Sequence, residues 1–277
     1  METAGRTPAE RAASLLERVR RAKPLVHHIT NVVVANLTAN ATLAAGALPV
    51  MAHAIEEAAD MAGAADALVL NMGTPTTATV EAMVAAGRAA NAKGIPVVFD
   101  PVGAGATPFR DRTAATILRQ VNVTLVRGNS AEIAFLAGIR AEIRGVEATA
   151  ATVGQGLAPA ELAPLAAARL QTVVAVTGPR DYVGDGRRLA VVDNGHPMMA
   201  RITGSGCTAT AIVAAFCAVE PDAVVAAASA LAYLGAAGEL AAAASRGPGS
   251  FQVNWLDELA NLTPAKLAEL AAISWKE

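Results

Sequence analysis

Short, continuous apolar runs alternate with longer segments of helical periodicity along most of the chain. Continuous runs of this length are typical of strands buried on both faces. The predicted strands are Leu25–Thr30, Leu48–Met51, Ala67–Leu70, a strand within Gly94–Pro101 that ends in a carboxylate, Val123–Val126 and Val173–Thr177. We therefore expect an α/β fold with helices on both faces of a mostly parallel sheet. No linker or repeat divides the sequence, so residues 1–277 are predicted to form a single domain.

Helix signals separate these strands. Thr7, Pro8 and Glu10 have the spacing of an N-cap, a first-turn proline and a capping-box acid, so a helix should run from there to about Arg21. Further helices are predicted at Val33–Ala45, Thr76–Ala92, Asp111–Gln120, Ala131–Leu136, Ala160–Leu170 and Thr208–Ala218. Tyr182–Gly184 and Leu189–Asp193 should form a hairpin, followed by a mainly helical remainder. Residues 138–157 have weak periodicity and are predicted to form a mobile loop.

Composition narrows the class of protein. Hydrophobic residues make up 53% of the chain and charged residues 17%, which excludes a disordered protein. The net charge is −2, so the chain lacks the basic footprint of a nucleic-acid-binding protein. The one basic cluster, Arg18–Lys23, is predicted to be a solvated helix face.

Several features indicate a cytoplasmic protein. Met1–Lys23 lacks the apolar core of a signal peptide and contains three glutamates. The most membrane-like stretch, Ala223–Gly238, is mostly alanine, which gains little from lipid, so we expect a buried helix. Cys207 and Cys217 are the only cysteines, and on one helix they would lie roughly 15 Å apart, too far for a disulfide.

Polar and glycine residues collect after the predicted strands. They are Thr30-Asn31, Asn71, Asp100, Arg127-Gly128-Asn129 and Thr177-Gly178. Ligands of open α/β sheets bind beyond the carboxyl ends of the strands, so we expect the functional site there.

The motif Gly204-Ser205-Gly206-Cys207 precedes a predicted helix. Glycines allow backbone N–H groups to point at one anion, and the helix dipole favours negative charge there, although an ordinary glycine-rich turn has the same pattern. Gly204-x-Gly206-x-x-Ala209 also matches a dinucleotide fingerprint, but the strand and acid that should follow it are missing. No Gly-Lys pair occurs, which excludes the usual P-loop.

Two acids are candidate Mg²⁺ ligands. Asp100 ends a strand, and Glu132 lies three residues after Asn129 at a strand-to-helix junction. Asn129 and Glu132 alone would suggest a capping box, but the two acids together supply the oxygen ligands that Mg²⁺ prefers near phosphates. The four histidines, including the adjacent His27 and His28, have no chelating spacing and are predicted to be structural.

Cys207 is the candidate catalytic side chain. At a helix N-terminus its thiol pKa should be lowered, although most free cysteines are simply small buried residues. A covalent mechanism would need a histidine base, and no neighbouring sequence signal supplies one.

Read in order, these motifs resemble the hydroxyethylthiazole kinase family of the ribokinase-like superfamily. The matching segments span nearly the whole chain: Pro24–Asn31, Pro49–Met51, Asn71–Thr74, Asp100–Gly103, Arg127–Glu132, Val176–Gly178, Asp181–Val183, Gly204–Cys207 and Gly247–Phe251. The resemblance implies a three-layer ribokinase-like fold. It also implies ATP-dependent phosphorylation of the hydroxyl of 4-methyl-5-(2-hydroxyethyl)thiazole, giving the thiazole phosphate used for thiamine phosphate synthesis.

The resemblance also implies roles for individual residues. Met51 and Gly204 match thiazole-contacting positions, and Asn31 borders that pocket. Arg127 and Thr177 match ATP-contacting positions. Asp100 and Glu132 match the acids associated with Mg²⁺. The anion hole corresponds to Gly204, Ser205 and Gly206. Cys207 would orient the alcohol or accept its proton. The resemblance also implies a homotrimer with active sites at the subunit boundaries.

Two departures bear on these expectations. The family commonly has threonine where this chain has Ser205, a change that keeps the hydroxyl. Most ribokinase-like enzymes have aspartate where Cys207 lies, which disfavours the alternative of a hydroxymethylpyrimidine kinase or a nucleotide-dependent hydrate dehydratase. A non-catalytic binding protein is the other alternative, and the presence of Asp100, Glu132 and Cys207 argues against it.

Overall fold

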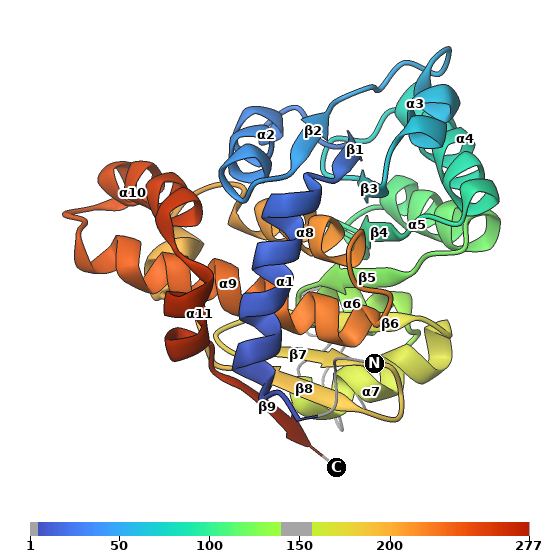
Figure 1. Ribbon diagram of the computed structural model, residues 1–277. Coiled ribbons are helices and arrows are strands. Elements are labelled where there is room, and N and C mark those ends of the chain that lie inside the picture. Colours follow the sequence, from blue (N-terminus) through green and yellow to red (C-terminus); the bar gives the residue numbers. More distant parts are fainter. Residues whose placement is uncertain (1–4, 140–156, 277) are drawn as a thin grey trace.

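A single twisted sheet organises the described part of the chain. The computed structural model describes residues 5–139 and 157–276. Its nine strands have the order β2-β1-β3-β4-β5-β6-β7-β8-β9 (Figure 1). They are β1 (Leu25–Ile29), β2 (Leu48–Val50), β3 (Ala67–Asn71), β4 (Val97–Asp100), β5 (Leu125–Gly128), β6 (Val173–Val176), β7 (Asp181–Gly184), β8 (Leu189–Val192) and β9 (Ile273–Lys276). The strands from β2 to β6 pair in parallel, and β7, β8 and β9 are antiparallel, as the predicted hairpin requires.

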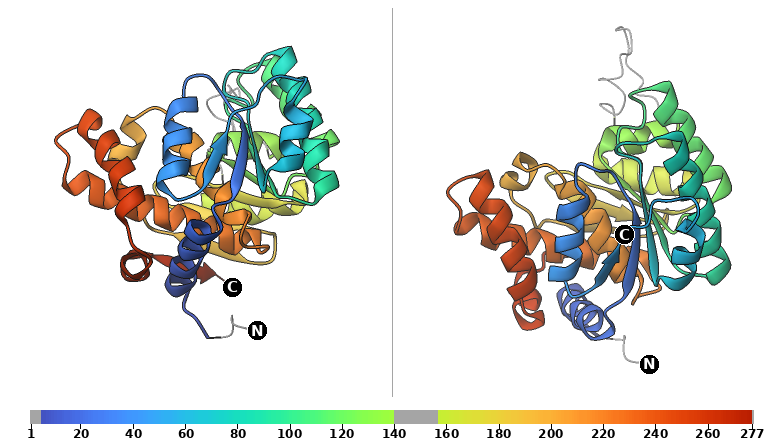
Figure 2. Two further views of the ribbon diagram at one scale, coloured as in Figure 1. Left: turned by 45° about the horizontal axis from the view of Figure 1, so that its top comes forward. Right: turned by 90° about the horizontal axis from the view of Figure 1, so that it is seen from above.

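Helices cover both faces of this sheet, as Figure 2 shows from two sides. They are α1 (Pro8–Ala22), α2 (Ala35–Ala44), α3 (Ala58–Ala64), α4 (Thr77–Lys93), α5 (Pro108–Gln120), α6 (Ser130–Leu136), α7 (Pro159–Leu170), the short 3₁₀ helix η1 (Pro197–Arg201), α8 (Ser205–Cys217), α9 (Ala223–Ala243), α10 (Pro248–Asn261) and α11 (Pro264–Leu270). One core cluster joins the sheet to α1, α2 and α8 to α11, and the other joins it to α3 to α7. The predicted α/β fold is confirmed.

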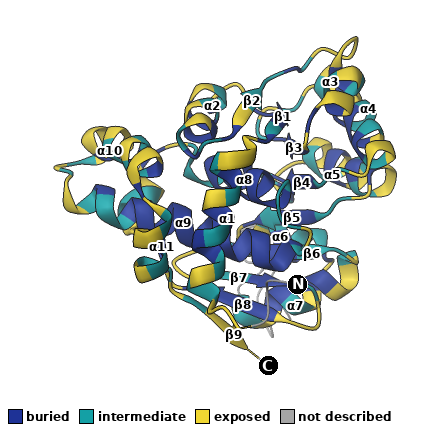
Figure 3. Ribbon diagram, viewed as in Figure 1, coloured by how far each residue is buried: buried dark blue, intermediate teal, exposed yellow. Residues whose placement is uncertain are grey.

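Helix α9 is the buried centre of the first layer. Among the described helices it is the one long and apolar enough to cross a membrane. Nearly all of its residues from Ala223 to Gly238 are buried, and it packs against α1, α8 and α10 (Figure 3). Its apolar composition is therefore that of a core helix, as the sequence predicted.

The basic cluster of α1 is less solvated than predicted. The predicted capping box of Thr7 and Glu10 is present and starts the helix. The Arg20 guanidinium donates to the carbonyl oxygens of Leu259 and Ala260 at 3.1 and 3.0 Å, at the end of α10. Arg18 pairs with Glu220 at 3.3 Å. Part of the cluster therefore holds α1 against the C-terminal helices, because cations stabilise the free carbonyls of a helix end.

Two elements were missed by the sequence reading: α3 and β9. Helix α3 is short and has no side-chain cap, and β9 is a four-residue strand at the sheet edge, so neither has a strong local signal. Helix α5 begins three residues earlier than predicted, because Thr107 caps it and Pro108 occupies its first turn. Residues 140–156 of the predicted mobile loop lie outside the described residues.

Candidate active site

The carboxyl ends of the parallel strands and the N-terminal end of α8 enclose a cavity of about 740 Å³. Eight of the predicted site residues line it: Asp100, Arg127, Glu132, Thr177, Gly204, Ser205, Gly206 and Cys207. These residues come from four separate segments between Asp100 and Cys207, and the parallel strand order brings them together.

The glycine turn is shaped by close approaches. Gly204 has a φ of +95°, a left-handed conformation that favours glycine. A Cβ on Gly206 would lie 2.7 Å from Arg127 Nη1. Glycine at position 206 therefore lets the Arg127 guanidinium lie directly against the first turn of α8. The guanidinium and the free N–H groups of the helix start together make this wall of the cavity electropositive.

Asp100 is completely buried beside that wall. Its Oδ2 accepts hydrogen bonds from Asn71 Nδ2 at 2.7 Å and Thr210 Oγ1 at 2.8 Å. Its Oδ1 lies 3.9 Å from Arg127 Nη1. Burial raises the pKa of Asp100 to about 6, and the charge of Arg127 opposes this shift. Within the described residues, Asp100 Oδ1 and Arg127 Nε are buried without a hydrogen-bond partner, which is unusual and points to a bound ligand.

Glu132 has the capping role that its spacing with Asn129 suggested. Its Oε2 accepts the N–H of Asn129 at 2.9 Å, and the side chain of Asn129 accepts the N–H of Glu132 at 3.0 Å. Its Oε1 accepts the N–H of Gly103 at 2.8 Å, in the loop after β4. Glu132 therefore joins the start of α6 to the loop that follows Asp100, and it lines the same cavity.

Cys207 lies in the first turn of α8, half-buried, and its environment overturns the predicted direction of its pKa. Burial raises the pKa of the thiol, and the nearby Asp100 carboxylate raises it further. The thiol is therefore protonated at neutral pH. Asn31 Nδ2 lies 3.5 Å from Cys207 Sγ and 2.9 Å from Asn71 Oδ1. Two amides thus connect Cys207 to Asp100.

Comparisons with known proteins agree with this geometry. The model of the hydroxyethylthiazole kinase family matches residues 16–265. The hydroxyethylthiazole kinase of Moorella thermoacetica is 58% identical over 94% of this chain and 96% of its own. That of Desulforudis audaxviator is 56% identical over 95% of each chain. The chain belongs to the hydroxyethylthiazole kinase family.

Solved structures extend the comparison to the fold. The hydroxyethylthiazole kinase protein of Pyrococcus horikoshii is 43% identical, covers 96% of this chain and 99% of its own, and has a TM-score of 0.87. A ribokinase-like superfamily protein of Enterococcus faecalis shares the fold. It is 14% identical, with a TM-score of 0.63 over 91% of this chain and 95% of its own. The resemblance drawn from motif order is confirmed: the chain is a kinase of this family with a ribokinase-like fold.

Two predicted residues of this kinase lie outside the cavity lining. Asn31 follows β1 and contacts Cys207 from the other side. Gly73 allows this arrangement, because a Cβ there would lie 2.6 Å from Asn31 Nδ2. Met51 follows the edge strand β2 and is half-buried. The structure therefore connects Asn31 to the catalytic candidate and leaves Met51 at the edge of the sheet.

The sequence reading of this kinase missed several residues of the site. Asn71 was placed at the expected site and in a segment that matches the family, but without a role; its register opposite Asp100 in the neighbouring strand would have indicated their contact. Asp181, Gly195, Met199, Leu234 and Gly235 also line the cavity. Asp181 lies in the segment Asp181–Val183 that matches the family, but no role was predicted for it. The other four lie in η1, in the loop before it and in the long apolar helix α9, and gave no signal of function.

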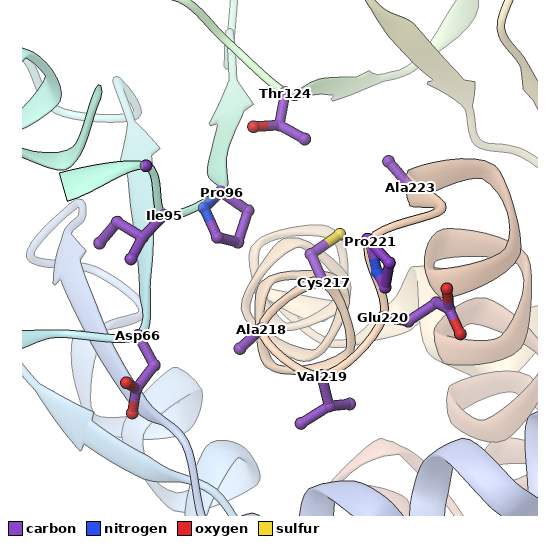
Figure 4. Close-up of a pocket in the computed structure, with 11 residues that line it drawn as sticks. Asp66, Ile95, Pro96, Thr124, Cys217, Ala218, Val219, Glu220, Pro221 and Ala223 are labelled. Carbon is purple, nitrogen blue, oxygen red and sulfur yellow. The ribbon is translucent and has the colours of Figure 1, made fainter. Parts of the chain in front are cut away.

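A second cavity, of about 500 Å³, lies at the opposite end of the sheet (Figure 4). Its walls are the C-terminal end of α8, including Cys217, and the turns that precede β3, β4 and β5. Asp66 accepts the N–H of Leu25 at 2.8 Å, and Thr124 Oγ1 accepts the N–H of Val97 at 3.0 Å. The polar side chains of this cavity are therefore occupied in holding the loops.

Proposed function

We propose that this kinase transfers the terminal phosphoryl group of ATP to the hydroxyl of 4-methyl-5-(2-hydroxyethyl)thiazole in the cavity at the N-terminal end of α8. The product is the thiazole phosphate used for thiamine phosphate synthesis. The observation that carries the proposal is the pair of unpartnered buried atoms, Asp100 Oδ1 and Arg127 Nε, beside the Gly204–Gly206 turn. A charged ligand with its cation would satisfy such a site, and an apolar ligand would not.

The triphosphate occupies the electropositive wall. The N–H groups of Gly204, Ser205 and Gly206 and the guanidinium of Arg127 bind the transferring phosphoryl group, and Thr177 contacts the nucleotide. Thr177 Oγ1 donates to the carbonyl oxygen of Gly128 at 3.3 Å, which fixes its position at the end of β6. Phosphoryl transfer has a loose transition state, so positioning and charge stabilisation supply most of the catalysis.

Asp100 and Glu132 are the residues that would hold Mg²⁺. They fit the ion, because both are carboxylates on the same cavity and Asp100 Oδ1 is free of hydrogen bonds within the described residues. Each Glu132 oxygen accepts one backbone N–H and keeps a second lone pair for a cation. Bound Mg²⁺ would neutralise the phosphate charges. Asp100 must be ionised for this role, which its pKa of about 6 permits at neutral pH.

Cys207 orients the acceptor hydroxyl. Because its raised pKa keeps the thiol protonated, it acts as a weak hydrogen-bonding group and contributes little as a base. Asn31 fixes the thiol and, with Met51 and Gly204, borders the thiazole ring. The ring therefore lies on the β1–β2 side of α8, and the nucleotide lies on the β5–β6 side.

The kinase acts as a cytoplasmic homotrimer, and residues 1–277 form one domain. Val32 and Val33, next to Asn31, are 82% and 66% exposed, and Leu48 on the edge strand is 45% exposed. Apolar side chains exposed next to the thiazole side of the site support burial at a subunit boundary. Such a boundary would also bring Met51 into a closed pocket.

The test combines activity with assembly. We expect purified protein to convert the thiazole alcohol to its phosphate with equimolar consumption of ATP, and to lose this activity when Mg²⁺ is chelated. Sedimentation should give three times the monomer mass. Consumption of ATP without formation of thiazole phosphate would refute the proposed reaction, and an active monomer would refute the trimer alone.

A further inference from the structure

Asp181 is a carboxylate in the active-site cavity to which the proposed reaction gives no role. It begins β7, where it pairs with Val192 of β8. Its Oδ1 accepts the N–H of Gly178 at 2.9 Å, which closes the turn after β6. Its other oxygen has no hydrogen-bond partner within the described residues. The side chain lines the cavity and so presents a free acceptor to a ligand.

Asp181 lies between two chemically different parts of the cavity. On one side are Thr177 and Gly178, next to Arg127 at the electropositive wall. On the other side is the strand partner of Asp181, Val192, which ends β8. The chain then enters the Asn194–Met199 segment, most of which lines the cavity with α9. Asp181 lines the same cavity as both parts, so a ligand that extends from the phosphate wall towards α9 can contact it.

The α9 end of the cavity is firmly built and combines apolar side chains with Asn194 and His196. A Cβ on Gly235 would lie 2.6 Å from the backbone of Asn194, and a Cβ on Gly238 would lie 2.7 Å from Met199 Sδ. Glu239 accepts the N–H of Gly195 at 2.8 Å. These contacts fix the segment directly on α9. Met199, Leu231 and Leu234 line this end, which suits a flat aromatic base.

We propose that Asp181 accepts hydrogen bonds from the ribose hydroxyls of the donor nucleotide. The inference rests on the proposed function, which puts ATP in this cavity with its phosphates at Arg127. With the base at the α9 end, the ribose is the part of the nucleotide that passes Asp181. A free carboxylate repels phosphates but accepts hydrogen bonds from a vicinal diol, so the hydroxyls are the complementary partner. Asp181 would then tell a ribonucleotide from its deoxy analogues.

The first measurement uses the unaltered enzyme. Its kcat/KM is compared for the Mg²⁺ salts of ATP, 2′-deoxy-ATP and 3′-deoxy-ATP at saturating thiazole alcohol. At least one deoxy analogue should lose a factor on the order of 10–100, the range for a hydrogen bond to a charged group. Equal use of all three nucleotides would overturn the role of Asp181 and leave the proposed kinase reaction intact. Failure to use ATP at all would refute the proposed function itself.

The second measurement assigns that discrimination to Asp181. In Asp181→Asn, which keeps an acceptor for the Gly178 N–H, and in Asp181→Ala, the ratio of ATP to deoxy-ATP should fall to within about threefold. A merely structural carboxylate would lower all three rates and leave the ratio unchanged. Asp193→Asn is the matched control, because Asp193 is exposed just after the neighbouring strand β8, pairs with Arg180 and does not line the cavity. It should retain the unaltered ratio.

Two further results keep the inference open to refutation. If a variant is inactive, calorimetry with ADP and 2′-deoxy- or 3′-deoxy-ADP reports the same ratio as binding affinities, and a wild-type ratio there would refute the inference. If the loss in Asp181→Asn is recovered by raised Mg²⁺ with the ratio unchanged, Asp181 serves the metal and the inference is wrong.

Discussion

Helix α8 has a cavity and a cysteine at each end, yet only one end has the character of an active site. At its N-terminal end, Asp100 Oδ1 and Arg127 Nε are buried without partners in the described structure. At its C-terminal end, Asp66 and Thr124 are occupied by backbone N–H groups, and Glu220 pairs with Arg18. The cavities differ modestly in volume, at about 740 and 500 Å³. Unsatisfied polar groups therefore distinguish the site better than size does.

The two cysteines of α8 likewise differ in their surroundings. Burial raises the pKa of both thiols, that of Cys217 to about 12. A helix N-terminus was expected to activate Cys207, but desolvation and the Asp100 charge dominate. What separates Cys207 from Cys217 is therefore its contact with Asn31 and the polar network, and not its acidity.

The largest expected effect comes from replacing Asp100, the acid at the N-terminal end of α8. Asp100→Asn should lower turnover roughly 10²–10³-fold, the range for loss of a preorganised electrostatic group. It should also stabilise the fold at pH 7.5, because a buried carboxylate with a raised pKa favours the unfolded state when ionised. The raised pKa limits this gain to ~3 kcal/mol. Steady-state kinetics and urea unfolding measure both quantities.

Asp66→Asn is the matched control for that change. It keeps an oxygen that accepts the N–H of Leu25, so its turnover should equal that of the unaltered enzyme. An equal loss of turnover in Asp66→Asn would break the distinction between the two ends of α8.

The cysteines give the next largest effect. Cys207→Ala should lower turnover on the order of 10²-fold, the loss expected when the acceptor hydroxyl is no longer held in position. Cys207→Asp should retain or raise turnover, because a carboxylate can accept the same hydrogen bond from the alcohol. Cys217→Ala should leave turnover unchanged and cost ~1 kcal/mol of stability, as a buried sulfur is removed. A folded but inactive Cys207→Asp would favour a covalent role for Cys207.

Met51→Ala tests how far the site extends beyond the cavity. Burial of a methionine side chain stabilises a contact by ~1.5–3 kcal/mol, so thiazole affinity should fall about tenfold or more. Calorimetry should show nearly unchanged ATP affinity. A fall in ATP affinity alone would remove Met51 from the thiazole pocket.

Buried polar atoms without hydrogen-bond partners also occur outside both cavities, on His27, His28 and Thr208. His28 tests whether such an atom by itself marks a functional residue. Both of its ring nitrogens are buried without partners among the described residues, and it lines neither cavity. Burial lowers its pKa to about 3, whereas an unfolded histidine titrates near 6.5. Its contribution to stability is therefore complete above pH 6.5 and lost progressively towards pH 3. At pH 5 this loss amounts to ~2 kcal/mol.

His28→Leu should remove that acid sensitivity and leave turnover unchanged. Asp100 acts in the opposite sense, since its raised pKa stabilises the fold as the pH falls from about 6 towards 4. The measurement is the difference in unfolding free energy between pH 7.5 and pH 5 in the two proteins. A loss of turnover in folded His28→Leu would extend the active site to β1.

The sequence by itself determined the elements with strong local signals and the identity of the family. The capping boxes of Thr7 and Asn129, the apolar strands and the order of the motifs all depend on residues close together in the chain. The glycines at the start of α8, Gly204 and Gly206, are also a signal within a few neighbouring residues. Hydrophobic period, caps and turns are local properties, so they can be read without the fold.

Only the tertiary structure decided how these pieces act on one another. The contact of Asn71 with Asp100, the approach of Arg127 to Gly206 and the position of Asp181 between the phosphate wall and α9 join residues distant in sequence. The direction of the Cys207 pKa shift also required the fold. Desolvation and charge pairing depend on which groups surround a side chain in space, and a local sequence pattern does not contain that information.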